Sequence, residues 1–167
     1  AGARALAIHG RTKVQGYRGD ADWAVIARVA EALEIPVIGN GTVDGGYDIA
    51  RARAHGAAGL MVGRPALGYP WIFRELRARR HGTPVPEPPS LRERWEMMLR
   101  YSREQQDRPS RRWEDLRWMR PRLKAFTASV PGGRKLRPAI DTVQSCEDLE
   151  RLAREHLRAY DPVAAAS

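Results

Sequence analysis

The chain has 167 residues, and 43% of them are hydrophobic, which is enough for a folded domain with an appendage and excludes wholesale disorder. Its net charge of +9 favours an anionic partner. The longest apolar run is too short to cross a bilayer, and no secretory signal pattern opens the chain. The single cysteine, Cys146, excludes an internal disulfide. We therefore expect a cytoplasmic protein without a membrane segment.

Residues 1–80 show a short apolar run followed by a helical pattern, three times over. Runs of this length suit buried strands, and strands that alternate with helices indicate parallel β-α units. The expected strands lie near residues 4–9, 36–38 and 58–62, and the expected helices near 23–33, 44–55 and 70–80. The sequence therefore predicts an α/β fold for this part of the chain.

Each predicted strand ends in a small polar group of residues. These groups are His9-Gly10-Arg11, Gly39-Asn40-Gly41 and Gly63-Arg64. Parallel strands bring their carboxyl ends to one edge, where ligands gather. Glycine lets backbone N–H groups approach a ligand, and an arginine can pair with a phosphate through two hydrogen bonds. The second and third groups together favour a phosphate site, although such glycines commonly serve tight turns alone.

His9 stands where the first strand ends, so it can hydrogen-bond a ligand or adjust the electronics of a flavin. A lone histidine is more often structural, so both interpretations stay open. No two histidines share metal-ligand spacing with a carboxylate or cysteine, and we expect no metal site.

A proline-rich stretch at residues 81–89 predicts a stiff linker and a domain boundary. Beyond it only helical patterns remain. Ser90 and Glu93 form a capping-box pattern for a helix to about residue 107. Ser110 can cap a second helix, which Pro121 should kink or restart. Shorter helical patterns cover residues 133–140 and 146–158, and a frayed tail is expected at 161–167.

The second half of the chain carries most of the positive charge. Between Leu91 and Arg137 there are 14 Arg plus Lys against 6 Asp plus Glu. Helices that mix arginines with aromatic residues suit the backbone of a folded RNA, although Arg-rich helices can simply be well solvated. The candidate RNA-binding residues are Arg111, Arg112, Arg117, Arg120, Arg122, Lys124, Arg134 and Lys135.

These residues together resemble the tRNA-dihydrouridine synthase family. The resemblance rests on four stretches in order, and it is looser after about residue 75. They are Ala7-Ile8-His9-Gly10-Arg11-Thr12, Ile35-Pro36-Val37-Ile38-Gly39-Asn40-Gly41, Gly56-Ala57-Ala58-Gly59-Leu60-Met61-Val62-Gly63-Arg64 and Ala66-Leu67-Gly68-Tyr69-Pro70-Trp71-Ile72-Phe73.

The resemblance implies the C-terminal part of an FMN-bearing (β/α)8 TIM barrel over residues 1–80, followed by a helical tRNA-binding domain over 90–160. Such enzymes reduce a uridine of tRNA to dihydrouridine, with NADPH as the reductant. It also implies that His9 contacts the flavin and that Arg11 supports the site. Asn40 and Gly41 would lie beside the ribityl phosphate, and Gly63 with Arg64 would bind the phosphate.

This sequence also departs from the family pattern, and the departures lead to a second expectation. The resemblance makes these strands the last three of the barrel, so the catalytic cysteine of the family would lie outside this chain. Cys146 matches a position in the helical domain and is not assigned that role. Pro121 stands where the family usually has a polar helix former. We expect the 167 residues alone neither to reduce uridine nor to hold FMN tightly.

Two other interpretations remain open at this point. Another FMN barrel, of the dihydroorotate or ene-reductase kind, would share the phosphate loops but has no need of a basic helical appendage. A non-enzymatic RNA-binding module would account for the charge but not for the strand ends. Two observations would distinguish these two interpretations and the tRNA-dihydrouridine synthase from one another. They are whether the protein binds flavin and whether its ligand is tRNA or a small acid.

Overall fold

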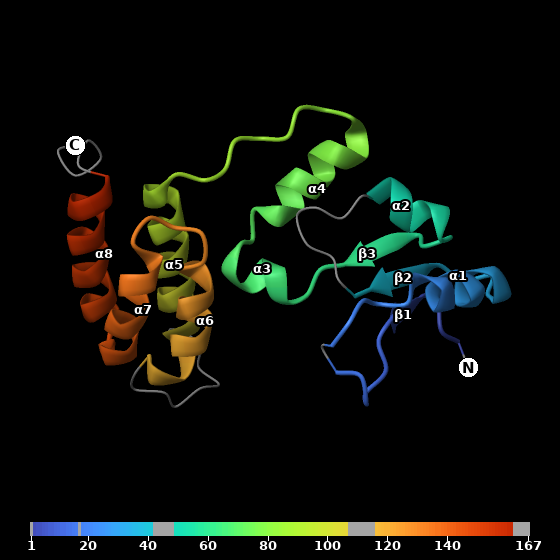
Figure 1. Cartoon of the computed structure of the whole chain (residues 1–167), viewed down its shortest axis with the longest axis horizontal. Helices are drawn as coiled ribbons and strands as arrows, with labels where there is room; N and C mark the ends of the chain where they lie inside the picture. The colour runs from blue at the N-terminus through green and yellow to red at the C-terminus, as the bar shows by residue number, and fades with distance from the viewer. Residues whose placement is uncertain (1, 17, 42–48, 107–115, 162–167) are drawn as a thin grey trace. The chain divides into compact units, whose positions relative to one another are not determined.

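A computed structural model of the chain describes residues 2–16, 18–41, 49–106 and 116–161, with only the backbone of residues 50 and 51. The chain divides into two compact units. The first comprises Ala1–Ala66 with Pro70–Pro86, and the second comprises Leu67–Tyr69 with Glu87–Ser167. Each unit has its own buried core, and Figure 1 shows the helices and strands of both.

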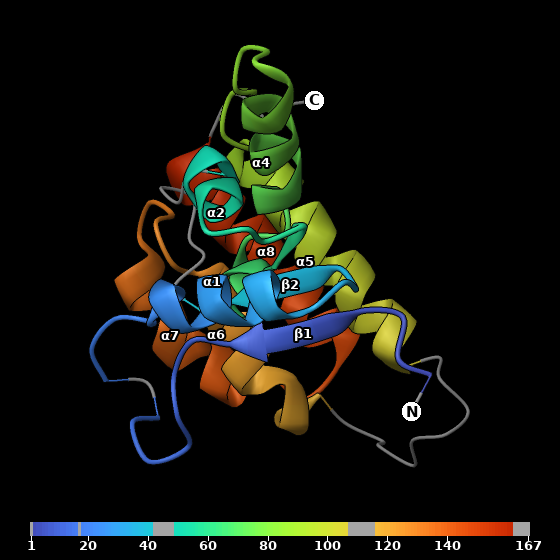
Figure 2. The same ribbon diagram turned by 90° about the vertical axis from the view of Figure 1, so that its right-hand side faces the viewer.

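The first unit is built on a parallel three-stranded sheet in the order β1-β2-β3 (Figure 1), and Figure 2 shows β1 beside β2. The strands are β1 (Leu6–His9), β2 (Val37–Asn40) and β3 (Gly59–Met61). All three fall where the apolar runs predict them. The register pairs Leu6 with Val37 and His9 with Asn40, and Asn40 in turn with Met61.

One face of this sheet is covered by α1 (Trp23–Ala32) and α2 (Ile49–Ala54). Ile26 of α1 and Val37 of β2 are buried in one apolar cluster with Ala52 and Ala57, and Leu60 packs against it. A glycine in a strand lets a side chain of the covering helix lie directly against the strand backbone. A Cβ added at Gly39 would lie 2.5 Å from the Trp23 ring, so the glycine allows α1 to pack closely against β2.

The N-terminus of α1 is fixed by a side chain. The Asp22 carboxylate accepts hydrogen bonds from the backbone N–H groups of Ala24 and Val25 at 2.9 and 3.2 Å. These two donors have no partner inside the helix, so the aspartate cap stabilises the first turn, by about 1 kcal/mol for a typical cap. Asp20 and Asp22 both precede the predicted helix and either could cap it by its residue type, and the structure shows Asp22 in this role.

The opposite face of the sheet carries the alternate residues of each strand. Because side chains alternate along a strand and paired residues point to the same side, this face bears six residues. They are Ala7, His9, Ile38, Asn40, Gly59 and Met61, all exposed or half-buried. We call this surface the open face.

Two helices follow β3. The short α3 (Arg64–Gly68) begins directly after Gly63, and α4 (Ile72–His81) follows it. The helical pattern predicts α4 near residues 70–80 but does not predict α3. Gly82 ends α4 in the left-handed conformation, with φ of 66°, a position that glycine adopts without steric cost.

Beyond residue 86, the described residues of the second unit form four α-helices and one 3-10 turn. They are α5 (Leu91–Gln106), η1 (Arg117–Met119), α6 (Arg120–Phe126), α7 (Gly133–Thr142) and α8 (Cys146–Tyr160). Helix α5 packs against α6 and α8, and α7 against α6 and α8 (Figure 1). The buried side chains between them include Trp95, Met98, Met119, Leu123, Phe126, Ile140 and Leu149.

Helix boundaries in this unit follow the predicted caps. Ser90 and Glu93 exchange hydrogen bonds at the start of α5, with the Ser90 backbone N–H donating to the Glu93 carboxylate at 2.7 Å. Ser145 and Asp148 do the same for α8. Pro121 lies in the first turn of α6, where its missing N–H costs nothing, so the helix restarts there as predicted.

Some expectations fall outside the described residues. These are the Ser110 cap, the first part of the helix expected near residues 44–55 and the tail beyond residue 161.

Candidate ligand site at the carboxyl edge of the sheet

His9, Asn40 and Met61 form one row across the open face. They pair in register at the carboxyl ends of their three strands. The Asn40 side-chain amide donates to the Met61 backbone oxygen at 2.7 Å, which orients the amide and leaves its oxygen as an acceptor. A histidine ring, an amide and a thioether therefore share one surface at the edge where parallel sheets bind ligands.

The His9 ring is oriented by its own turn. The backbone N–H of Arg11 donates to Nδ1 of His9 at 3.0 Å. Since Nδ1 accepts this bond, the proton of the neutral ring lies on Nε2. His9 can therefore offer an N–H donor to a ligand on the open face.

The Arg11 side chain stabilises the loop rather than reaching across the sheet. Its Nε and Nη2 atoms donate to the Gly19 carbonyl oxygen at 3.1 and 2.8 Å. The guanidinium thus fastens the loop between β1 and α1 beside His9. A supporting role for Arg11 fits this geometry and stays a prediction.

Gly41 follows β2 in a conformation that favours glycine, with φ of 131°. A Cβ at this position would lie 2.6 Å from the Ala21 Cβ and 3.4 Å from the His9 ring. The missing side chain keeps the space beside the histidine open. Residues 42–48 lie outside the described part of the chain.

Gly63 and Arg64 follow β3 at the same edge. A Cβ at Gly63 would meet no atom within 4 Å, so the backbone here borders open space. Arg64 is exposed and is the first residue of α3. An exposed guanidinium beside an unobstructed backbone suits an anionic group such as a phosphate.

Cys146 lies in the second unit and is buried at the N-terminus of α8. Its thiol lies 2.9 Å from the Gln106 side-chain oxygen. The sequence predicts a partly buried apolar position for this cysteine, and the structure confirms its burial.

The predicted RNA-binding residues differ in what their side chains already contact. Arg120 is half-buried, and its Nε and Nη2 atoms donate to the Val143 carbonyl oxygen at 3.0 and 2.7 Å. Lys124 pairs with Asp141 at 2.6 Å, and the Arg122 guanidinium lies 5.4 Å from the centre of the Trp118 ring. An RNA contact from Arg120 would have to compete with its internal bonds.

The remaining candidates lie on the surface. Arg117, Arg134 and Lys135 are exposed, the last two in the first turn of α7. Arg111 and Arg112 lie outside the described residues. The RNA-binding set stays a prediction, with its exposed members the better candidates.

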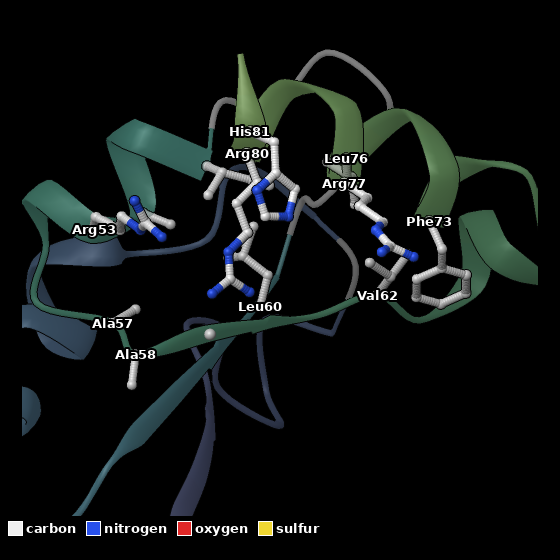
Figure 3. Close-up of a pocket in the computed structure, with 13 residues that line it drawn as sticks. Arg53, Ala57, Ala58, Leu60, Val62, Phe73, Leu76, Arg77, Arg80 and His81 are labelled. Atoms are coloured by element: carbon white, nitrogen blue, oxygen red, sulfur yellow. The ribbon is translucent and has the colours of Figure 1, made fainter. Parts of the chain in front are cut away.

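Sequence patterns missed two features of the first unit. Met61 joins the row on the open face only because of the strand register, which a single sequence does not specify. A cavity of about 310 Å³ also lies between α2, β3 and α4, with arginines from both helices on its wall (Figure 3). The helical spacing of Arg77 and Arg80 was the only feature of the sequence that could have indicated this cavity. Arg53, which lines the same cavity, is far away in the sequence.

None of the helices in the described residues is long and apolar enough to cross a membrane. Over the same residues, no group of three or more His, Cys, Asp or Glu side chains is placed to hold a metal ion.

The fold and the row of side chains define a class of protein. It is an α/β chain with ligand-directed groups at the carboxyl edge of a parallel sheet, followed by a basic helical unit. Comparison with known sequences gives the family: the profile described as "Dihydrouridine synthase (Dus)" matches residues 1–160. The chain therefore belongs to the dihydrouridine synthase family.

Individual relatives agree with this assignment. A probable tRNA-dihydrouridine synthase of Mycobacterium leprae is 37% identical over 155 residues, which are 90% of this chain and 40% of the relative. The tRNA-dihydrouridine synthase B of Pseudomonas aeruginosa is 35% identical over 156 residues, 88% of this chain and 44% of the relative. The chain thus spans less than half the length of these relatives.

Proposed function

We propose that this chain forms the FMN-phosphate and tRNA-binding part of a cytoplasmic tRNA-dihydrouridine synthase, an enzyme that reduces uridine in tRNA to 5,6-dihydrouridine. The observation that carries the proposal is the register of His9 and Asn40 on the open face, with Gly63 and Arg64 after the next strand at the same edge. Membership of the family supports the chemistry.

The residues at this edge fit a flavin nucleotide. His9 would offer its Nε2–H, and Asn40 its side-chain oxygen, to polar atoms of the ring or the ribityl chain. Gly63 leaves room for a phosphate, and Arg64 would neutralise it. Bound FMN supplies the hydride chemistry for reducing the C5–C6 bond of uracil, with NADPH as the source of electrons.

The sheet of the first unit also supports the view that more strands complete the site. Three strands with an open face form part of a (β/α)8 barrel, where such a face would line the interior. The expected catalytic cysteine would then come from another part of the protein. On this view the 167 residues alone do not reduce uridine.

The proposal is tested by joining the chain to the part of the P. aeruginosa synthase B that lies outside its matched segment. The chimera should bind FMN and form dihydrouridine in unmodified tRNA when NADPH is supplied, while the 167 residues alone should form none. Arg64→Gln should weaken FMN binding about tenfold, because a charge-assisted phosphate contact is lost.

The matched control is Arg79→Gln, an exposed arginine in α4 away from the strand ends. Its FMN affinity should equal that of the unsubstituted chimera. A folded chimera that binds neither FMN nor tRNA would contradict the proposal. Dihydrouridine formed by the isolated chain would contradict the view that the 167 residues alone do not reduce uridine.

A further inference from the structure

Helix α3 is shared between the two units. By its contacts Leu67–Tyr69 belongs to the second unit, although the residues up to Ala66 and those from Pro70 belong to the first. These three residues are the last two of α3 and the one that follows the helix. Helix α3 therefore begins with Arg64 in the first unit and ends in the second.

The end of α3 packs against the backbone of α6. A Cβ added at Gly68 would clash with the Ala125 carbonyl group, since it would lie 2.7 Å from the carbonyl carbon and 3.0 Å from the Ala125 Cβ. Only glycine, which has no Cβ, allows two backbones to approach so closely. Gly68 therefore fixes the end of α3 against α6 without a flexible side chain between them.

Arg94 of α5 holds the residue after the helix. Its guanidinium carbon lies 5.0 Å from the centre of the Tyr69 ring, within the range of a cation–π interaction. Its Nη1 atom also donates a hydrogen bond to the Ala128 carbonyl oxygen at 3.2 Å. Arg94 is half-buried, and a cation–π interaction is stronger where water is partly excluded. The Arg94 side chain thus ties Tyr69 to the second unit.

Arg64 lies about one helical turn from this anchored end. Four residues of an α-helix advance by about 6 Å, so Arg64 and Gly68 are the two ends of one short rigid piece. The Ala66 backbone N–H donates to the Gly63 carbonyl oxygen at 3.1 Å, which joins α3 to the end of β3. The position of the last residue of α3 therefore limits the direction of its first side chain.

We propose that Gly68 and Arg94 are positioning residues for the phosphate site. They anchor the end of α3 in the second unit and so hold the Arg64 guanidinium where a flavin phosphate would bind. The inference rests on the proposed function, because that function assigns the phosphate to Arg64. It adds that the helical unit contributes to flavin affinity through α3.

The anchor itself can be tested without flavin in the 167-residue chain. Arg94→Met keeps much of the apolar stem but removes the charge, so it should loosen the end of α3. Hydrogen exchange across residues 64–69 should therefore be faster in this variant than in the unsubstituted chain. Unchanged exchange would overturn the proposal.

The effect on the phosphate is tested in the chimera with the P. aeruginosa synthase B. FMN carries a phosphate that riboflavin lacks, so only FMN reports on the Arg64 contact. Arg94→Met should weaken FMN binding about fivefold and leave riboflavin binding within about twofold. Gly68→Ala should act in the same direction, because its Cβ displaces α3 from α6 although alanine favours a helix more than glycine does.

The matched control is Arg100→Met, which removes an exposed arginine from the same helix. Its ion pair with Glu104 is exposed and contributes little to stability, so exchange and the binding of both flavins should match the unsubstituted protein. Arg94→Lys, whose ammonium group can also lie over the Tyr69 ring, should recover much of the FMN affinity.

A double variant separates positioning from general destabilisation. If Arg94 acts through Arg64, adding Arg94→Met to Arg64→Gln should weaken FMN binding by less than about twofold further. Equal losses for FMN and riboflavin, or fully additive losses in the double variant, would overturn the proposal, because a merely structural contact would not single out the phosphate.

The outcomes also distinguish this inference from the proposed function. An unsubstituted chimera that binds no FMN would contradict both. FMN binding that depends on Arg64 but not on Gly68 or Arg94 would contradict the inference alone.

Discussion

His156 is a buried histidine whose neutral form holds part of the second core together. The Trp95 indole N–H donates to its Nδ1 at 3.0 Å, and its Nε2 lies 2.8 Å from the Pro131 carbonyl oxygen. With Nδ1 accepting, Nε2 carries the proton and donates to that carbonyl. Tyr160 covers the ring, with ring centres 4.9 Å apart. The sequence gives no sign of this role, since His156 lies on an ordinary helical pattern and its partners are distant in the chain.

The His156 network predicts how stability depends on pH. Burial lowers the pKa of His156, and the hydrogen bond to Pro131 opposes this shift only in part. The unfolded chain, with a histidine pKa of about 6.5, then binds a proton that the folded chain resists. The stabilisation is complete above about pH 6.5 and is lost as the pH falls below that value towards the lower pKa of the folded state.

Thermal unfolding followed by circular dichroism should therefore show a falling Tm between about pH 6.5 and pH 5, above the range where most carboxylates titrate. His156→Phe should have a lower Tm at pH 7 and a flatter profile across this window, because the titrating ring is gone. A Tm that rises as the unsubstituted chain is acidified from pH 6.5 to pH 5 would contradict the assignment.

Two cations of the second unit should respond differently to substitution. Arg120 donates twice to the Val143 carbonyl oxygen, and a hydrogen bond from a charged group typically contributes about 1.5–3 kcal/mol. Arg120→Gln should therefore lower the free energy of unfolding by about that amount. Lys135→Gln, at an exposed site, should leave it within about 0.5 kcal/mol but weaken tRNA binding. Denaturant titrations and gel-shift assays on both variants measure the difference, and equal stability losses would contradict it.

At the scale of the helix, α8 begins with a reciprocal cap. The Ser145 hydroxyl accepts from the Asp148 backbone N–H at 3.1 Å, and the Asp148 carboxylate accepts from the Ser145 backbone N–H at 3.2 Å. Backbone hydrogen bonding from Gln144, followed by the Arg151 guanidinium, lowers the pKa of Asp148. The cap therefore operates with a charged carboxylate at neutral pH.

Ser145→Ala should destabilise the second unit by about 1 kcal/mol, because one backbone donor of the first turn loses its acceptor. Ser145→Thr should retain most of the stability, since its hydroxyl can make the same bond. Urea unfolding followed by far-ultraviolet circular dichroism compares the two. An alanine variant as stable as the threonine variant would show that the cap contributes little.

Strand and helix positions could largely be predicted from the sequence, because apolar runs and capping residues act locally. The Ser90 and Ser145 starts and the Pro121 restart follow from adjacent residues alone. The sequence predicts that the strand ends share one edge, but it does not predict that His9, Asn40 and Met61 form a row. The row depends on the strand register, which is set by contacts between distant segments. The short helix α3 was missed because five residues are too few to show a helical period.

At the scale of the whole molecule, the net charge of +9 should govern RNA binding. Each phosphate that a cationic side chain neutralises releases counterions, so the affinity for tRNA should fall steeply as salt rises from about 50 to 200 mM. Filter binding with unmodified tRNA measures the slope, and Arg134→Gln should make it shallower by one contact. An affinity that does not change with salt would contradict a phosphate-dominated interface.

In the part of the chain that the structure describes, no strand pairs with the outer edges of β1 and β3, which has a consequence for handling the isolated chain. Exposed edge strands can pair with the edge strands of another molecule and so cause aggregation. Because the chain is strongly cationic, electrostatic repulsion between copies slows this association. Ions in the buffer shorten the reach of that repulsion, to about 10 Å at 0.1 M. Light scattering from a concentrated stock should therefore grow faster at high ionic strength than at low, so a dilute, low-salt buffer should slow aggregation.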